Sequence, residues 1–321
     1  MTEITFKIDW LAITGWGLPS YALELWQEWL SDYLGDPVPM GFGGRGYKSI
    51  GKSLAGAKLY TQPANEGNHF HIELPASACD AIPPEQMSRM MQYLAEQEEP
   101  ENHRFRVTRL DLAWDGVNFT PQDFLEAVEN DYIRTLAKRE TTRVEQSPMT
   151  EKEDGSLGTT TIYLGSRTST RSIRVYDKRG FTRVELEIRQ ERADQIARLL
   201  LVELPQKWSE LGIAHLRDYI DVFENDEKEN LAPWWEELVT GIVRANLKVS
   251  DAADIELVRL QRWMVTQVAP ALSVLMDTVG LRVLESYVAY GRHKRGDRYK
   301  HLLENIKPEP PFRMQQSQLA M

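Results

Sequence analysis

The stretch TTTIYLGSRTSTRSIRVYDKRGFTRVELEIR, residues 159–189, decides the fold. Apolar and polar side chains alternate in three runs of it, 159–165, 171–178 and 181–189, which is the pattern of half-buried β-strands. The connections between the runs are short. The three strands are therefore predicted to form an antiparallel meander.

The segments before this meander mix strand patterns with helix patterns. Strands are predicted over 1–14, 57–62, 69–74 and 106–116, and helices over 18–35, 84–98 and 120–131. In 1–14 the apolar side holds Ile4, Phe6, Ile8 and Trp10, against Thr5, Lys7 and Asp9. The polar segment 138–158 is predicted to be a loop. From about residue 190 onward the pattern is almost entirely helical. We therefore predict an α+β fold, in which an antiparallel β-sheet core with flanking helices (1–195) is followed by a mostly α-helical C-terminal region (196–321).

Composition narrows the class of protein. The chain has 321 residues and one cysteine, Cys79, so an internal disulfide or a zinc knuckle built on cysteines is excluded. The first ten residues include Glu3 and Lys7 where a signal peptide would need an apolar run, and no apolar run is long enough to span a bilayer. We expect a cytoplasmic protein without a membrane partner.

The net charge of −10 argues at first against a partner as acidic as DNA. The charge is uneven, however: residues 166–192 carry eight basic and four acidic side chains, and residues 282–300 carry six basic and two acidic ones. Because salt screens charges beyond about 8–10 Å, the local balance decides whether a polyanion binds. These two basic stretches keep nucleic acid open as a partner.

Alternation also predicts which side chains share the polar face of the sheet. On strand 106–116 these are Arg109, Asp111 and Asp115; on 171–178, Arg174, Tyr176 and Lys178; and on 181–189, Arg183, Glu185, Glu187 and Arg189. With Arg179 and Gly180 as the turn, Tyr176 is predicted opposite Arg183, and Arg174 opposite Glu185.

Two interpretations of this face remain open. Converging carboxylates repel one another, and a hard divalent cation relieves that repulsion while leaving positions for phosphate oxygen. A phenol with a neighbouring cation or base is a usable nucleophile. The alternative is an exposed ladder of salt bridges with no chemistry.

The motifs on these strands resemble those of the rolling-circle replication initiation factor family, which includes initiators of small plasmids and filamentous phages and related relaxases. The resemblance spans roughly 4–195. It rests on Arg109-Leu-Asp111, Tyr163-Leu-Gly165-Ser166-Arg167-x-Ser169, Arg174-x-Tyr176-Asp177-Lys178 and Arg183-x-Glu185-x-Glu187-x-Arg189.

The resemblance implies a metal-dependent DNA nickase. Tyr176 would attack a phosphodiester at the replication origin, remain joined to the 5′ end and later rejoin the strand. The implied site residues are Asp111, Glu185 and, as a weaker third ligand, Glu187 for Mg²⁺ or Mn²⁺, with Arg174, Lys178 and Arg183 around the nucleophile. Tyr163 is the rival nucleophile.

The resemblance also implies the partners. These are double-stranded origin DNA and its exposed single strand, a host helicase and polymerase, and a second copy of the chain in a homodimer. The side chains expected at DNA are Arg167, Ser169, Arg171, Arg189, Arg292, Lys294 and Arg295. Residues 1–195 would form the catalytic nicking domain, and 196–321 would contact origin DNA or the second copy. A non-catalytic DNA-binding initiator or regulator, or a relaxase of a mobile element, is the alternative.

Two further motifs suggest chemistry that their surroundings do not support. Gly46-Tyr-Lys-Ser-Ile-Gly51-Lys52-Ser53 fits the phosphate-loop pattern, yet strand-like sequence follows it where a helix is required, so a glycine-rich hairpin is favoured over an ATPase. His69 and His71 share one face of a strand and could bind a metal, but Glu73 offers an ordinary structural partner.

Overall fold

The computed structural model describes residues 4–17, 19–65, 67–98, 104–147, 159–178, 180–201, 203–240, 264 and 268–295. The chain divides into two compact units, Met1–Leu247 and Lys248–Met321.

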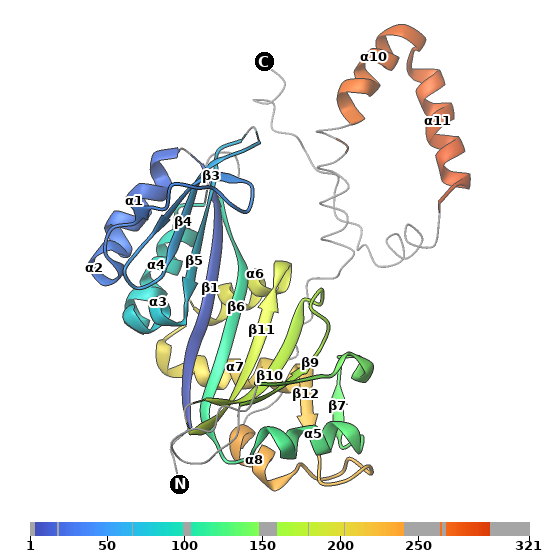
Figure 1. Cartoon of the computed structure of the whole chain (residues 1–321). Helices are drawn as coiled ribbons and strands as arrows, with labels where there is room; N and C mark the ends of the chain where they lie inside the picture. The colour runs from blue at the N-terminus through green and yellow to red at the C-terminus, as the bar shows by residue number, and fades with distance from the viewer. Residues whose placement is uncertain are drawn as a thin grey trace. The chain divides into compact units, whose positions relative to one another are not determined.

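The first unit is built on one antiparallel sheet of ten strands in the order β2-β3-β4-β5-β1-β6-β11-β10-β9-β8. The strands are β1 (Thr5–Trp16), β2 (Val38–Pro39), β3 (Tyr47–Lys52), β4 (Lys58–Pro63), β5 (His69–Pro75), β6 (Arg104–Val117), β8 (Arg143–Gln146), β9 (Thr160–Leu164), β10 (Arg171–Lys178) and β11 (Phe181–Arg189). The longest, β1 and β6, are neighbours at the centre of the sheet (Figure 1).

The predicted meander is confirmed. β9, β10 and β11 are neighbours, and the register pairs Arg174 with Glu185 and Tyr176 with Arg183, as expected from alternation. β11 also pairs with β6, which brings Glu187 opposite Asp111. The polar side chains of three strands therefore share one face.

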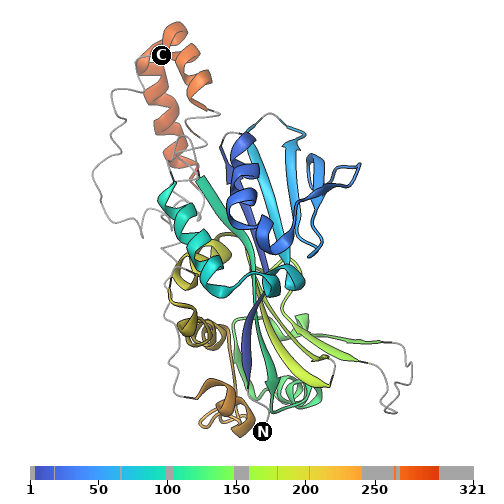
Figure 2. The same ribbon diagram turned by 90° about the vertical axis from the view of Figure 1, so that its left-hand side faces the viewer.

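Helices cover the opposite face. Those of the first unit are α1 (Pro19–Trp29), α2 (Ser31–Leu34), α3 (Ala76–Ala81), α4 (Pro84–Glu96), α5 (Pro121–Glu129), α6 (Gln190–Leu200), α7 (Trp208–Tyr219) and α8 (Pro233–Val239), with short 3-10 helices η1 (Arg139–Thr141) and η2 (Pro205–Lys207). In Figure 2 the teal and yellow helices α4, α6 and α7 lie along one side of the sheet.

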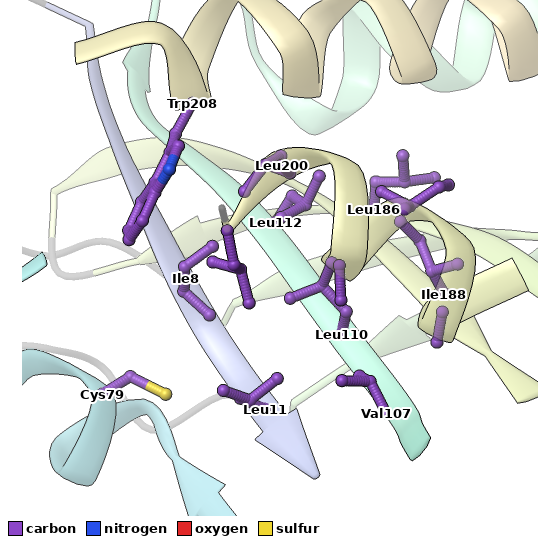
Figure 3. Packing of buried hydrophobic residues seen from close by; sticks show 14 of the residues in the cluster. Ile8, Leu11, Cys79, Val107, Leu110, Leu112, Leu186, Ile188, Leu200 and Trp208 are labelled. Carbon is purple, nitrogen blue, oxygen red and sulfur yellow. The ribbon is translucent and has the colours of Figure 1, made fainter. Parts of the chain in front are cut away.

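Helix α6 illustrates why the helices pack there. Ala193, Ile196, Ala197 and Leu200 recur at helical spacing and are all fully buried. Figure 3 shows Leu200 beside Leu112 of β6. Burial of one such leucine contributes about 1.5–3 kcal/mol, so this apolar layer stabilises the packing of the helices on one face of the sheet. The polar side chains lie on the other face.

The compact unit is longer than the segment 1–195 expected from the sequence. A division at residue 195 falls inside α6, whose apolar side chains belong to the core of the sheet. Trp208, Leu216 and Trp235 from the following helices join the same core. The packing therefore continues at least through α8.

Three local predictions differ from the structure. The helix expected over 18–35 is divided into α1 and α2 at Leu30. A separate two-stranded sheet pairs β7 (Ile133–Thr135) with β12 (Ile220–Val222), and three residues are too few for alternation to stand out. The polar segment 138–158, expected as a loop, contains η1 and β8 in its described part.

The second unit contributes two described helices, α10 (Ala269–Val279) and α11 (Leu281–His293). They meet at Gly280, whose φ of +77° is in the left-handed region that glycine adopts without strain. Val274, Tyr287 and Val288 are exposed on them. No helix in the described part of the chain is long and apolar enough to cross a membrane.

Candidate active site

The polar face of the central strands, which we call the open face, lies opposite the helices. Its core is an acid cluster, Asp111, Glu185 and Glu187, supplied by β6 and β11. All three carboxylates are buried. Three buried negative charges at adjoining strand positions require compensation, because an unpaired charge away from water is costly.

Arginines provide that compensation, and one of them, Arg189, pairs with Glu187. Arg109 Nη2 lies 2.6 Å from Asp111 Oδ2 and 3.0 Å from Glu187 Oε2. Arg174 Nη2 lies 3.4 Å from Asp111 Oδ2 and 3.9 Å from Glu187 Oε2, and it also forms an ion pair with Glu185. A single cationic nitrogen therefore has an oxygen of each carboxylate within ion-pair distance.

The pKa of Asp111 shows how strongly burial disfavours a charge in this cluster. Burial raises the pKa of Asp111 to about 8, and the charges of Glu185 and Glu187 act in the same direction, against the opposing effect of Arg109. Ionisation of Asp111 is therefore costly in this buried position, and a cation bound beside it would favour the charged form.

The donor set fits a hard divalent cation in its chemistry, since all its donors are carboxylate oxygens. Arg174 Nη2 already marks a position that an oxygen of each acid faces, and the buried Nε of the same side chain has no hydrogen-bond partner among the described residues. As the side chains stand, no group of three His, Cys, Asp or Glu side chains in the described ranges forms a ready metal site. Cation binding would require Arg174 to move.

Tyr176 borders the acid cluster on β10. Its hydroxyl donates a hydrogen bond of 3.1 Å to Glu185 Oε2. Burial raises the pKa of Tyr176 well above its ordinary range, and the charge of Glu185 adds to the effect, while Arg183 opposes it. The phenol is therefore protonated at rest and has an acceptor in place for its proton.

Arg183 anchors the other side of Tyr176. It is fully buried and forms ion pairs with Asp9 of β1 and Asp115 of β6. A second hydrogen bond joins Arg183 Nη2 to Asp115 Oδ2 at 2.6 Å. Lys178 Nζ lies 3.8 Å from Asp9 Oδ1, and burial together with the neighbouring Arg183 lowers the pKa of Lys178.

Replacing Arg183 by Met is expected to destabilise the protein by about 3–5 kcal/mol, because Asp9 and Asp115 would lose a buried partner. Urea unfolding measures this loss. Arg106→Met is the control, since Arg106 and Glu191 form a partly exposed pair at 2.8 Å that is worth less than about 1 kcal/mol. Equal losses in the two variants would contradict the anchoring role of Arg183.

The side chains expected at DNA belong to both compact units. Arg167 is 77% exposed in the β9–β10 connection, and Arg189 donates to its carbonyl oxygen at 2.7 Å while also pairing with Glu187. Ser169 lies in the same connection. In the second unit Arg292, Lys294 and Arg295 are exposed at the end of α11.

Arg171 does not fit the predicted DNA contact. It lies opposite Ile188, on the helix-covered face, and is only 5% exposed. Its Nη1 donates to Asp218 Oδ2 of α7 at 2.6 Å, and its guanidinium stacks on Tyr219. These contacts give Arg171 a structural role, in joining α7 to the sheet.

Alternation alone missed part of the site because β1 contains a bulge. The sequence predicts Trp10 beside Ile8 on the apolar side, and this is wrong. Ile8 lies opposite Leu112, whereas Trp10 lies opposite Asp111, so one extra residue, Asp9, shifts the register. Asp9 keeps the polar side that alternation predicts, and Trp10 joins it on the open face, where Arg109 stacks on the Trp10 ring at 4.6 Å.

The phosphate-loop motif forms the β3–β4 hairpin. Lys52 is the last residue of β3 and pairs with Lys58 of β4, so no helix follows it to receive a nucleotide phosphate. The hairpin interpretation is confirmed.

Tyr163, the rival nucleophile, lies opposite Arg174, and its ring is covered by Arg143 at 4.6 Å.

The two histidines have ordinary partners. His69 Nδ1 lies 2.7 Å from the hydroxyl of Tyr47, and His71 Nδ1 lies 2.9 Å from the hydroxyl of Thr14. His71 Nε2 lies 3.8 Å from Glu73 Oε1, the partner expected from the sequence.

Glu73 makes the acid stability of the protein testable. Burial by itself would raise its pKa, but interactions with His71 and Tyr60 and the charge of Arg45 lower the pKa to about 2. A depressed pKa contributes stability at pH values above the ordinary carboxyl range, and that stability is lost as the pH falls toward 2.

The unfolding free energy of both proteins should fall between pH 6 and pH 3. We expect the fall to be smaller in Glu73→Gln than in the unchanged protein, by about 1–2 kcal/mol. Denaturant unfolding at both pH values measures the difference. Glu24→Gln, at an exposed position of α1, is the control and should keep the unchanged protein's pH dependence. An identical pH dependence for Glu73→Gln would rule out the depressed pKa.

Comparison with known proteins places these strands in a family. A family model described as replication initiation factor matches residues 105–288, more than half of the chain. The match includes β6, β10 and β11, the strands that carry Asp111, Tyr176 and Glu185. No curated protein matches the chain.

Among solved structures, the fold is similar to the rolling circle replication initiator protein from Geobacillus stearothermophilus. The two share 19% identity with a TM-score of 0.57, over 75% of this chain and 98% of that one. A TBP from Methanococcus jannaschii aligns over 61% of this chain and 95% of its own at 11% identity, but its TM-score of 0.27 carries no argument.

Proposed function

The chain belongs to the replication initiation factor family, and on that premise we propose that it nicks and rejoins one strand of origin DNA through a covalent bond to Tyr176. The observation that carries the proposal is the position of the Tyr176 hydroxyl. It lies beside a buried acid cluster and is hydrogen-bonded to Glu185, on strands inside the family match.

In the proposed reaction the Tyr176 oxygen attacks the phosphorus of the scissile phosphodiester. The bond from phosphorus to the tyrosine oxygen forms, and the bond from phosphorus to the 3′ oxygen breaks. Glu185 takes the phenolic proton through the existing 3.1 Å hydrogen bond. The departing 3′ oxygen takes a proton from water and becomes a hydroxyl, and Glu185 then returns its proton to solvent. The products are a 5′-phosphotyrosine and a 3′ end that host polymerase extends. Attack by a 3′ hydroxyl on the phosphotyrosine reverses the step and rejoins the strand.

The neighbouring cations support this reaction in different ways. Lys178 is partly exposed and lies two residues from Tyr176 along β10, so its charge faces the incoming phosphate. Arg183 is already paired with two carboxylates and instead holds the strands around Tyr176 in place. Arg174 keeps the acid cluster neutralised until DNA arrives.

We propose that Asp111 and Glu185, with Glu187 as a weaker third ligand, hold the Mg²⁺ or Mn²⁺ that the family chemistry implies. When bound, the cation would supply Lewis-acid stabilisation of the charge on the phosphate and the leaving oxygen. The protein contributes three buried carboxylates as oxygen donors and the Arg174 side chain, which must withdraw for the cation to bind.

The remaining assignments follow from the same proposal. We assign nicking to the compact unit Met1–Leu247, which extends the expected segment 1–195, and contacts to duplex origin DNA or a second copy to the second unit, where Arg292, Lys294 and Arg295 are exposed. Arg167, Ser169 and Arg189 are the proposed contacts to the exposed single strand. A separate helicase unwinds the duplex, since the phosphate-loop motif forms a strand hairpin.

Incubation with a supercoiled plasmid carrying the cognate origin tests the proposal. With Mn²⁺ or Mg²⁺ we expect a nicked product with protein attached to its 5′ end. A protein that binds the plasmid but leaves it intact would favour the alternative of a non-catalytic initiator or regulator. Nicking of the transfer origin of a mobile element, without nicking of a replication origin, would favour the alternative of a relaxase.

A further inference from the structure

One edge of the sheet has a charge opposite to that of the chain. Residues 37–65 contain four basic side chains, Arg45, Lys48, Lys52 and Lys58, and no acidic one, in a chain of net charge −10. This segment forms β2, β3 and β4, at one end of the ten-stranded sheet (Figure 1). We call it the basic edge. None of its cations takes part in the site around Tyr176.

The arrangement of the cations is unfavourable without an external anion. Lys52 and Lys58 lie directly opposite each other in the β3–β4 ladder, and like charges at opposed positions destabilise a sheet. The nearest acid, Glu73, lies 3.9 Å from Lys58 and is already paired with Arg45 at 2.6 Å. Lys48 and Lys52, both exposed, form no ion pair within the part of the chain that the structure describes.

The loop before β3 presents further groups to solvent. Its turn requires glycine at position 43, because a Cβ there would lie 2.2 Å from the carbonyl oxygen of Tyr47. Arg45 adopts a left-handed φ of +54°, which costs free energy and is held by its ion pair with Glu73. The loop leaves Phe42 58% exposed and the Arg45 side chain 61% exposed.

We infer that the basic edge is a second DNA-binding surface, which contacts the phosphate backbone of duplex DNA away from the nicked phosphodiester. The inference rests on the proposed function for the presence of DNA and goes beyond it in assigning this surface. Exposed cations spaced along a sheet edge can pair with backbone phosphates without reading the bases. Phosphates of the duplex would then pair with Lys48 and Lys52, and they would relieve the opposition of Lys52 and Lys58.

The test is the salt dependence of duplex binding by the double variant Lys48→Gln/Lys52→Gln. Fluorescence anisotropy with a labelled origin duplex, without divalent cations, gives Kd between 50 and 300 mM salt. Each lost phosphate contact reduces the slope of log affinity against log salt by about 0.9. We expect a slope smaller by about 1–2 and an affinity at 50 mM salt lower by roughly 10-fold or more.

The matched control is Lys138→Gln/Lys207→Gln, which removes the same charge from exposed positions of the same compact unit. It should keep the slope of the unchanged protein. An unchanged slope in the Lys48/Lys52 variant, an equal loss in the control, or a loss seen only with single-stranded DNA would overturn the inference. Because the binding measurement contains no cleavage step, its outcome is independent of the Tyr176 chemistry.

Discussion

Tyr176→Phe is expected to abolish the covalent protein–DNA product and to lower origin nicking by about 10⁴-fold or more, because the substitution removes the only atom of this side chain that can bond to phosphorus. The ring stays and the hydrogen bond to Glu185 is lost, so the cost in stability should be about 0.5–1.5 kcal/mol. Nicked plasmid and protein-linked DNA are measured on the same gel, and duplex binding is measured in parallel.

Tyr163→Phe is the matched control. Tyr163 lies on the neighbouring strand opposite Arg174, its ring is covered by Arg143, and it takes no part in the proposed reaction. This variant should nick at close to the original rate. Persistence of the adduct in Tyr176→Phe together with its loss in Tyr163→Phe would move the nucleophile to β9.

The second large effect is expected for the acid cluster. Asp111→Asn and Glu185→Gln keep the shape of each side chain but remove a carboxylate charge from the proposed cation site. We expect nicking to fall by about 10²–10⁴-fold in each variant, while DNA binding stays largely intact. The same plasmid assay, with Mg²⁺ or Mn²⁺ varied over a wide range, measures both the rate and the cation requirement.

Glu98→Gln is the control for this pair of variants. Glu98 is also bonded to an arginine, with Arg198 Nη1 at 2.8 Å, but it lies before β6 and outside the acid cluster. It should nick normally. Normal nicking by Asp111→Asn or Glu185→Gln would place the cation elsewhere, and His69 and His71 would be the first positions to examine.

Much of the site was predictable because strands have a strict period of two. Once Arg179 and Gly180 were taken as a turn, alternation was enough to pair Tyr176 with Arg183 and Arg174 with Glu185, and the structure has that register. The placement of Asp111 beside Glu187 needed in addition the order of the strands, because β6 and β11 are far apart in the sequence.

The parts that could not be predicted depend on irregular backbone and on tertiary packing. The bulge in β1 brings Trp10 to the open face beside Asp9, and no sequence period marks a single extra residue. Arg171 was expected at DNA because it lies in a basic stretch. Its burial against Asp218 depends on α7, which alternation within β10 does not describe.

The charge of the sequence also predicts only part of the binding surface. The net charge of −10 and the local basic stretches together left nucleic acid open as a partner. The structure adds that the acids of the site are held by Arg109 and Arg174, while the basic edge has exposed lysines without such partners among the described residues. Pairing in three dimensions, which composition does not contain, decides which charges remain for a ligand.

The most direct test of the account is to locate the covalent bond itself. The protein is incubated with Mn²⁺ and a single-stranded oligonucleotide spanning the origin nick site, digested with trypsin and examined by mass spectrometry. The account predicts a nucleotide phosphate on the peptide that contains Tyr176, between Arg174 and Lys178. A modified peptide containing Tyr163, or cleaved DNA with no peptide attached, would contradict it.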